Sequence, residues 1–253
     1  MAQAVYTDRG RSVDVDVQDY TGELLDLIAG IEQQEITLTS DAEIDDVIIN
    51  VANTASLSAG SYLFLNEDGR TYESRILSTT ATTITLNDPL DYAYTTAAVG
   101  YGALQNLNVN GSVTAQTAFI RPAAGVKWHI TRMLVEIVDN ADMNDTLFGG
   151  IPALTNGVLF RISNGVTKNL FSVRDNGDFA LRSFDANYSE AGNPGLGLTA
   201  FRVRKTFTRS GAVIELDGKE GGETADQLEV IIRDDLTALS RFNVIFQGHV
   251  VTD

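Results

Sequence analysis

The chain has 253 residues, of which 18 are Lys or Arg and 34 are Asp or Glu, so its formal net charge is −16. The absence of Cys excludes disulfides, zinc–thiolate sites and cysteine nucleophiles. This surplus of acid argues against a general nucleic-acid binder and against adhesion to anionic membranes, because both need net Lys and Arg. No membrane-spanning segment is expected, and residues 1–20 lack the apolar stretch of a signal peptide.

The charge is unevenly distributed along the chain. Residues 1–110 contain 4 basic and 17 acidic side chains, a balance of −13, whereas residues 111–253 contain 14 and 17, a balance of −3. A shift of this size indicates two modules with different surroundings. The acidic part either forms a solvated surface that aids solubility, or docks on a basic partner or binds cations.

Residues 1–35 are predicted to form an N-terminal arm. Alternating Val residues over 13–17 predict a short strand with one solvent-exposed face. An amphipathic helix is predicted over 22–33, because four apolar residues follow at helical spacing: Leu24, Leu25, Ile28 and Ile31. An isolated helix of this length is marginal in water, so these residues should contact their own domain or a neighbouring subunit. They are candidate assembly contacts.

Residues 36–110 are predicted to form a small acidic β domain that resembles a barrel. Apolar segments separated by turn signals occur at 36–38, 47–51, 62–65, 71–77 and 83–86. The sequence Asn66-Glu-Asp-Gly69 between two of them is a hairpin signal. The spacing fits a small barrel or meander.

Residues 111–253 are predicted to form an antiparallel jelly-roll sandwich of eight or nine strands. Apolar residues alternate up to Ile130 and resume out of phase at Met133, which predicts a β-bulge between them. Further strands are expected at 158–162, 170–173, 179–184, 201–207, 212–216, 228–232 and 242–251. The residues at 139–157 and 185–199 are expected to be long irregular connections.

The sequence contains no catalytic signature, so no enzymatic activity and no cofactor are predicted. His129 and His249 have no metal-ligand spacing and are interpreted as surface or structural residues. Clustered loop carboxylates are weak candidates for a Ca²⁺ site, with a solvated loop as the alternative: Asp139, Asp142 and Asp145.

The densest basic stretch also has two interpretations. Its residues are Arg202, Arg204 and Lys205. They either contact an acidic partner, including the acidic module of a neighbouring copy, or form the solvent face of an edge strand that blocks edge-to-edge pairing.

Several phrases of the sequence resemble virion structural proteins of tailed bacteriophages. They are Ser12-Val-Asp-Val-Asp-Val17, Leu57-Ser-Ala-Gly-Ser-Tyr62, Thr83-Ile-Thr-Leu-Asn-Asp-Pro-Leu-Asp-Tyr92, Phe148-Gly-Gly-Ile-Pro-Ala-Leu-Thr-Asn-Gly157 and Gln247-Gly-His-Val-Val251. The resemblance implies a non-enzymatic, multi-copy virion component that is made in the host cytoplasm and binds other virion proteins. Such a protein is expected to be a homo-oligomer, either a trimer or a ring.

The position on the particle has two alternatives. A tail-associated role in fibre, collar or baseplate attachment is favoured, and a capsid decoration or cement protein is the alternative. A third hypothesis is a carbohydrate- or receptor-binding jelly-roll module for a host surface glycan. Its exposed aromatic residues would come from loops, such as Tyr92, Tyr94, Tyr101 or Tyr188.

Overall fold

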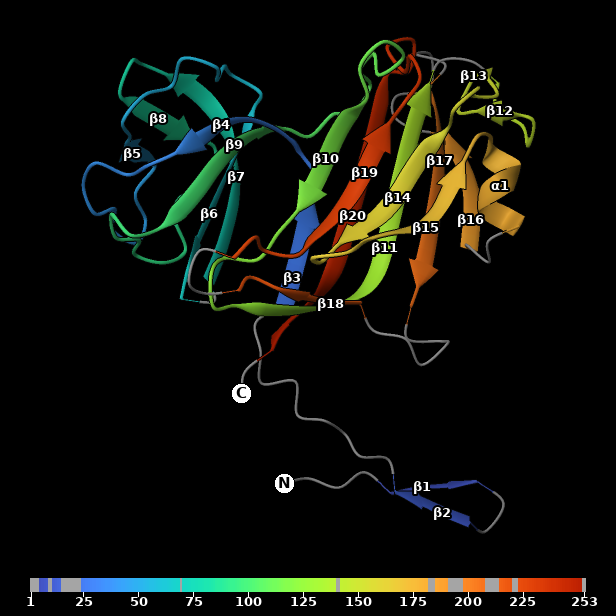
Figure 1. The fold of residues 1–253 in the computed structure, drawn as a ribbon, viewed down its shortest axis with the longest axis horizontal. Helices are drawn as coiled ribbons and strands as arrows, with labels where there is room; N and C mark the ends of the chain where they lie inside the picture. The colour runs from blue at the N-terminus through green and yellow to red at the C-terminus, as the bar shows by residue number, and fades with distance from the viewer. Residues whose placement is uncertain are drawn as a thin grey trace.

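The structure is a computed structural model, and it describes residues 5–8, 11–14, 24–68, 70–139, 142–181, 185–190, 198–207, 214–219 and 223–251. It is mainly β, as predicted, with several antiparallel sheets (Figure 1). A short hairpin near the N-terminus pairs β1 (Val5–Asp8) with β2 (Arg11–Asp14). The strand predicted over 13–17 therefore overlaps β2 at residues 13 and 14, and its remaining residues lie outside the described ones.

One six-stranded sheet forms the small module, in the order β4-β9-β6-β7-β8-β5. Its strands are β4 (Ile31–Ile36), β5 (Ile48–Asn50), β6 (Tyr62–Glu67), β7 (Arg70–Thr79), β8 (Thr83–Leu86) and β9 (Val99–Leu104). The predicted hairpin at residues 66–69 is confirmed, since Glu67 is the register partner of Arg70. The barrel-like prediction is wrong, because β4 and β5 remain separate edges and the sheet does not close.

The helix predicted over 22–33 is also wrong. This segment forms β3 (Leu24–Ile28) and β4, and Gly30 between them bridges to Phe119. The apolar residues fit a period of two as well as a helical period: Leu25 and Leu27 are buried, whereas Leu24 and Asp26 are exposed. The segment forms a strand and not a helix because β3 pairs antiparallel with β20, more than 200 residues later in the chain.

The second module consists of two sheets. The larger sheet has the order β16-β17-β11-β20-β3, with β18 also paired to β11, and the smaller has the order β10-β19-β14-β15. Beside β3, the larger sheet contains β11 (Lys127–Asp139), β16 (Asp185–Glu190), β17 (Thr199–Thr206), β18 (Ile214–Asp217) and β20 (Arg241–Val251). The smaller sheet contains β10 (Gln116–Ile120), β14 (Val158–Ser163), β15 (Thr167–Val173) and β19 (Gln227–Ile232).

The two sheets share one hydrophobic core. It includes fully buried side chains from both: Trp128, Phe201 and Phe242 from the larger sheet, and Phe160 and Val230 from the smaller. The predicted β-bulge in β11 is confirmed, since the register with β20 shifts between Ile130 and Arg132. The bulge keeps apolar residues on both sides of it pointing into the core.

The strand predicted over 179–184 is wrong in its first half, which belongs to helix α1 (Asn176–Leu181), and its second half lies outside the described residues. Asp175 and Asp178 favour a helix start here: the Asp175 carboxylate accepts a hydrogen bond from the Asp178 amide, and Asp178 accepts one from the Arg174 amide. The stretches predicted as irregular contain β16 and a small hairpin of β12 (Leu147–Phe148) and β13 (Ile151–Pro152).

An aromatic contact joins the two modules. Phe119 of β10 packs beside Tyr101 of β9, with ring centroids 5.6 Å apart, and Tyr101 stacks on Phe64 at 4.7 Å. The Arg121 guanidinium lies 5.2 Å from the Tyr101 ring centroid and 3.5 Å from a carboxylate oxygen of Glu32. These contacts fix the small module against the second one.

A half-buried carboxyl group completes the junction. Glu73 of β7 accepts hydrogen bonds from the Gln105 side chain at 2.6 Å and from the Ile28 amide of β3 at 3.3 Å. Burial raises the pKa of Glu73 to about 7, although the hydrogen bonds from Gln105 and Ile28 lower it, and the nearby Asp26 charge contributes to the rise. Glu73 is therefore protonated more readily in the folded chain than in the unfolded one.

We expect this group to make stability fall as pH rises. A carboxyl whose folded pKa is raised contributes stability that is present below its unfolded pKa and is lost as pH passes the folded value, about 7. Between about pH 5 and about pH 8 the loss should be about 1–3 kcal/mol. Glu73→Gln should abolish this change in urea unfolding, whereas the exposed control Glu35→Gln should keep it. Equal pH dependence in wild type and Glu73→Gln would contradict the assignment.

Candidate functional site

The outer face of the six-stranded sheet in the second module brings together several residues that the sequence pointed to. On β17, Phe201 and Val203 are buried in the core, so Arg202 and Arg204 point outward and are exposed. On β3, at the far edge of the same sheet, Leu24 is 82% exposed. We call this surface, formed by β17, β11, β20 and β3, the outer face.

The remaining predicted contact residues lie elsewhere. Leu25 is buried in the core, and Ile31 of β4 packs against that core from the module junction. Lys205 is half-buried at a position in register with the core residue Met133. The structure therefore divides the two predicted groups: Leu24, Ile28, Arg202 and Arg204 share the outer face, and the other three do not.

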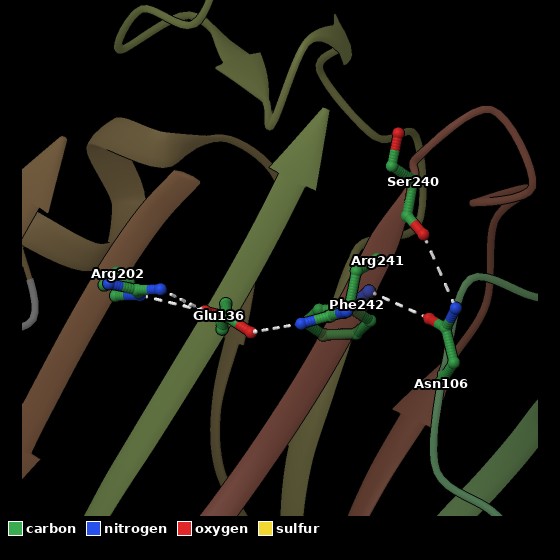
Figure 2. Close-up of polar contacts among 6 residues, drawn as sticks. All are labelled: Asn106, Glu136, Arg202, Ser240, Arg241 and Phe242. Carbon is green, nitrogen blue, oxygen red and sulfur yellow. Dashed lines mark hydrogen bonds and ion pairs between the residues drawn. The ribbon is translucent and has the colours of Figure 1, made fainter. Parts of the chain in front are cut away.

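A charged network crosses three strands of the outer face (Figure 2). Glu136 of β11 accepts from Arg202 of β17, with the closest oxygen–nitrogen distance 2.8 Å, and lies 3.5 Å from Arg241 of β20. The network follows from register, because Glu136 is directly opposite Arg202. Such exposed pairs contribute little to stability, so their main effect is to orient the two arginines.

An apolar row lies beside this network. Leu134 of β11 is the register partner of Ile245 of β20, which in turn pairs with Ile28 of β3, and all three side chains are half-buried. Arg204 is the partner of Leu134 on the other side. An apolar centre with arginines at its rim is the composition of many protein–protein interfaces.

The two histidines of the chain also meet on the outer face. His129 and His249 are opposite each other on β11 and β20, with ring centroids 5.3 Å apart. His129 lies 3.2 Å from the Glu215 carboxylate, which is its register partner on β18. Burial, together with the neighbouring His129, lowers the pKa of His249. The pair is part of the surface of the sheet.

The residues that the structure describes contain no group of three or more His, Asp or Glu side chains that could hold a metal ion. The three proposed Ca²⁺ ligands lie in different environments: Asp139 is buried at the end of β11, whereas Asp142 and Asp145 are exposed. The geometry therefore gives no support to a Ca²⁺ site there.

Sequence reasoning missed one polar residue that holds the start of β20. Asn106, in the segment after the small module, accepts from the Phe242 amide at 3.1 Å, and its side-chain amide lies 3.5 Å from the Ser240 carbonyl oxygen (Figure 2). These bonds tie that segment to the start of β20. Alternation along β20 could have placed Arg241 and Ile245 outward, but no local signal identifies Asn106.

The aromatic residues proposed for glycan binding form no exposed platform among the side chains that the structure describes. Tyr94 and Tyr101 are buried, and Tyr92 is half-buried with the Arg70 guanidinium 5.1 Å from its ring centroid. The side chain of Tyr188 lies outside the described ones. The carbohydrate-binding hypothesis therefore loses two of its four aromatic residues.

Comparison with family models, with curated proteins and with solved structures found no match to this chain. Within the described residues, no helix combines the length and the apolar character needed to cross a bilayer.

Proposed function

We propose that this chain is a non-enzymatic structural component of a tailed-phage virion that assembles with other virion proteins through its outer face. The observation that supports this most directly is the composition of that face, where the exposed Leu24 and Arg202 flank a half-buried apolar row. The sequence phrases that resemble virion proteins point in the same direction. A tail-associated role in fibre, collar or baseplate attachment is favoured over capsid decoration.

Part of this proposal is that the second module is a jelly-roll variant. The chain crosses repeatedly between its two sheets, from β10 to β11, from β11 to β14, from β15 to β16, from β18 to β19 and from β19 to β20. Such crossings are characteristic of jelly rolls. The variant feature is the hairpin of β14 and β15, which are neighbours in one sheet. A rigid sandwich of this kind suits packing in rings or trimers.

The proposal is tested on phage particles. We expect the protein in purified virions, and we expect deletion of its gene to yield particles that lack a tail structure when viewed by electron microscopy. Quantitative mass spectrometry separates the two positions, because a tail component is present in few copies and a decoration protein in hundreds. Complete, infectious particles that never contain the protein would overturn the proposal.

A further inference from the structure

An exposed apolar patch lies at the tip of the small module. Its four side chains are between 44% and 57% exposed: Ile44, Val47, Ile48 and Leu77. Ile48 of β5 is opposite Thr85 of β8, and Leu77 occupies the β-bulge where β7 reaches Thr85. Ile48 and Leu77 therefore lie on either side of Thr85, and Ile44 and Val47 belong to the segment that leads into β5. Single exposed apolar residues are ordinary, but a group of them indicates an interaction site. We call these four residues the tip patch.

Six carboxylates, five of them exposed, belong to the two chain segments at the tip patch. Four lie in the same chain segment, Asp41, Glu43, Asp45 and Asp46, and two more, Asp88 and Asp91, lie in the neighbouring segment. Hydrogen bonds hold the two segments together: the Asp45 amide donates to the Leu90 carbonyl at 2.8 Å, and the Leu90 amide donates to the Asp46 carbonyl at 2.9 Å. Between residues 24 and 110 the sequence has two basic residues, Arg70 and Arg75 of β7, against 12 acidic ones. The negative charge favours a basic binding partner and disfavours nucleic acids and anionic lipids, and the apolar patch favours a partner with apolar side chains.

The outer face of the second module has the complementary composition. Four exposed arginines lie on three neighbouring strands, Arg132 on β11, Arg202 and Arg204 on β17, and Arg241 on β20. They lie around the Leu134 end of the apolar row of Leu134, Ile245 and Ile28, whose other end on β3 lies next to Asp26. Two carboxylates share the face: Glu136 binds two of these arginines, and the exposed Asp26 of β3 accepts a hydrogen bond from Gln247. The described part of the outer face is therefore a mixed surface with four arginines against two carboxylates.

The tip patch and the outer face lie on separate parts of the molecule. In Figure 1, β5 and β8 lie at the end of the small module that points away from the second module, whereas the outer face runs from β3 in the middle of the molecule to β17 near the other end. The tip patch therefore cannot cover the outer face of its own chain. We propose that the tip patch of one copy docks head to tail on the outer face of the next copy. This inference rests on the proposed assembly function and names its partner. A head-to-tail contact closes into a ring or continues as a chain.

The proposal is tested by analytical ultracentrifugation of the full chain. Wild type should self-associate, and the dissociation constant should rise at least about tenfold between ~50 mM and ~500 mM NaCl, because salt screens exposed charges. Ile48→Glu in the tip patch and the double variant Arg202→Glu, Arg204→Glu in the outer face should each weaken association at least about tenfold. Asp91→Lys is a second tip variant that leaves the core untouched.

Matched controls lie on other surfaces. Val166→Glu changes an apolar side chain that is 74% exposed in the turn after β14, and Lys168→Glu reverses an exposed charge on β15. Neither substitution should change the dissociation constant. Far-UV circular dichroism should show the same fold for all variants.

The decisive experiment mixes the two variants and measures whether they form a dimer. Ile48→Glu keeps an intact outer face, and the double arginine variant keeps an intact tip patch, so their equimolar mixture should form a 1:1 dimer that neither variant forms alone. The head-to-tail contact is overturned if the wild-type chain stays monomeric up to about 1 mM, or if the mixture forms no dimers. In that case the partner of the tip patch would be a different, basic protein. A monomeric chain that is nevertheless found in virions overturns this inference alone. A self-associating chain that never enters virions overturns the virion proposal alone.

Discussion

Replacing Gly248 by alanine is expected to lower the free energy of unfolding by about 3 kcal/mol or more. Gly248 lies on β20 opposite Ile130, directly beside the β-bulge of β11. A Cβ atom built at this position would lie 2.0 Å from the carbonyl oxygen of His129 and 2.9 Å from the carbonyl carbon. Both neighbouring atoms are backbone, so no side-chain rotation can relieve the contact and the two central strands of the sheet must separate.

Urea unfolding of Gly248→Ala measures this effect, with Gly165→Ala as the matched control. Gly165 has a positive φ of 77°, but only the Lys219 ammonium approaches its Cβ position, at 4.0 Å. The control should therefore cost only about 1 kcal/mol, the usual penalty for a left-handed alanine. Equal losses for the two variants would show that the close approach of β20 to β11 imposes no steric constraint of its own.

The β-bulge and the hairpin at residues 66–69 were predictable because both depend on local pattern. A change of phase between Ile130 and Met133 requires one extra residue in β11 whatever the strand pairs with. Similarly, an Asp-Gly turn favours a tight hairpin through backbone preference alone, and Asp68 indeed adopts a left-handed φ of 48°. In both cases the structure is determined within a few residues of the signal.

The strand β9 was not predicted from the sequence, because it depends on contacts between residues that are distant in the chain. Gly100 and Gly102 lower its β propensity, but each faces a large side chain from elsewhere in the small module. A Cβ atom on Gly102 would lie 2.3 Å from Leu57, and one on Gly100 would lie 2.8 Å from Leu65. The glycines are required by packing that becomes apparent only after the sheet has formed.

Prediction of the candidate site from the sequence is limited in the same way. Alternation along β17 predicts that Arg202 and Arg204 point away from the core, and this is what the structure shows. The sequence cannot show that Leu24 and Ile28 belong to the same face, because that depends on the pairing of β3 with β20 and of β20 with β11. The outer face is therefore a product of long-range register.

Truncation of Phe242 to alanine is expected to cost about 3–5 kcal/mol. Phe242 is fully buried on β20, its ring centroid lies 5.6 Å from that of Phe148, and its backbone binds Asn106. The truncation removes the ring from the centre of a packed core and deprives Phe148 of its edge-to-face contact.

The experiment compares Phe242→Ala with Phe242→Leu and Arg241→Ala by urea unfolding. Leucine retains most of the buried apolar surface and should cost less than half as much, whereas Arg241 is exposed on the adjacent position and should change stability by less than about 1 kcal/mol. Because the three substitutions lie on the same strand, any local backbone change affects all of them alike, so the differences isolate side-chain burial. A loss below about 1 kcal/mol for Phe242→Ala would mean that the two sheets do not pack on Phe242 as the structure has it.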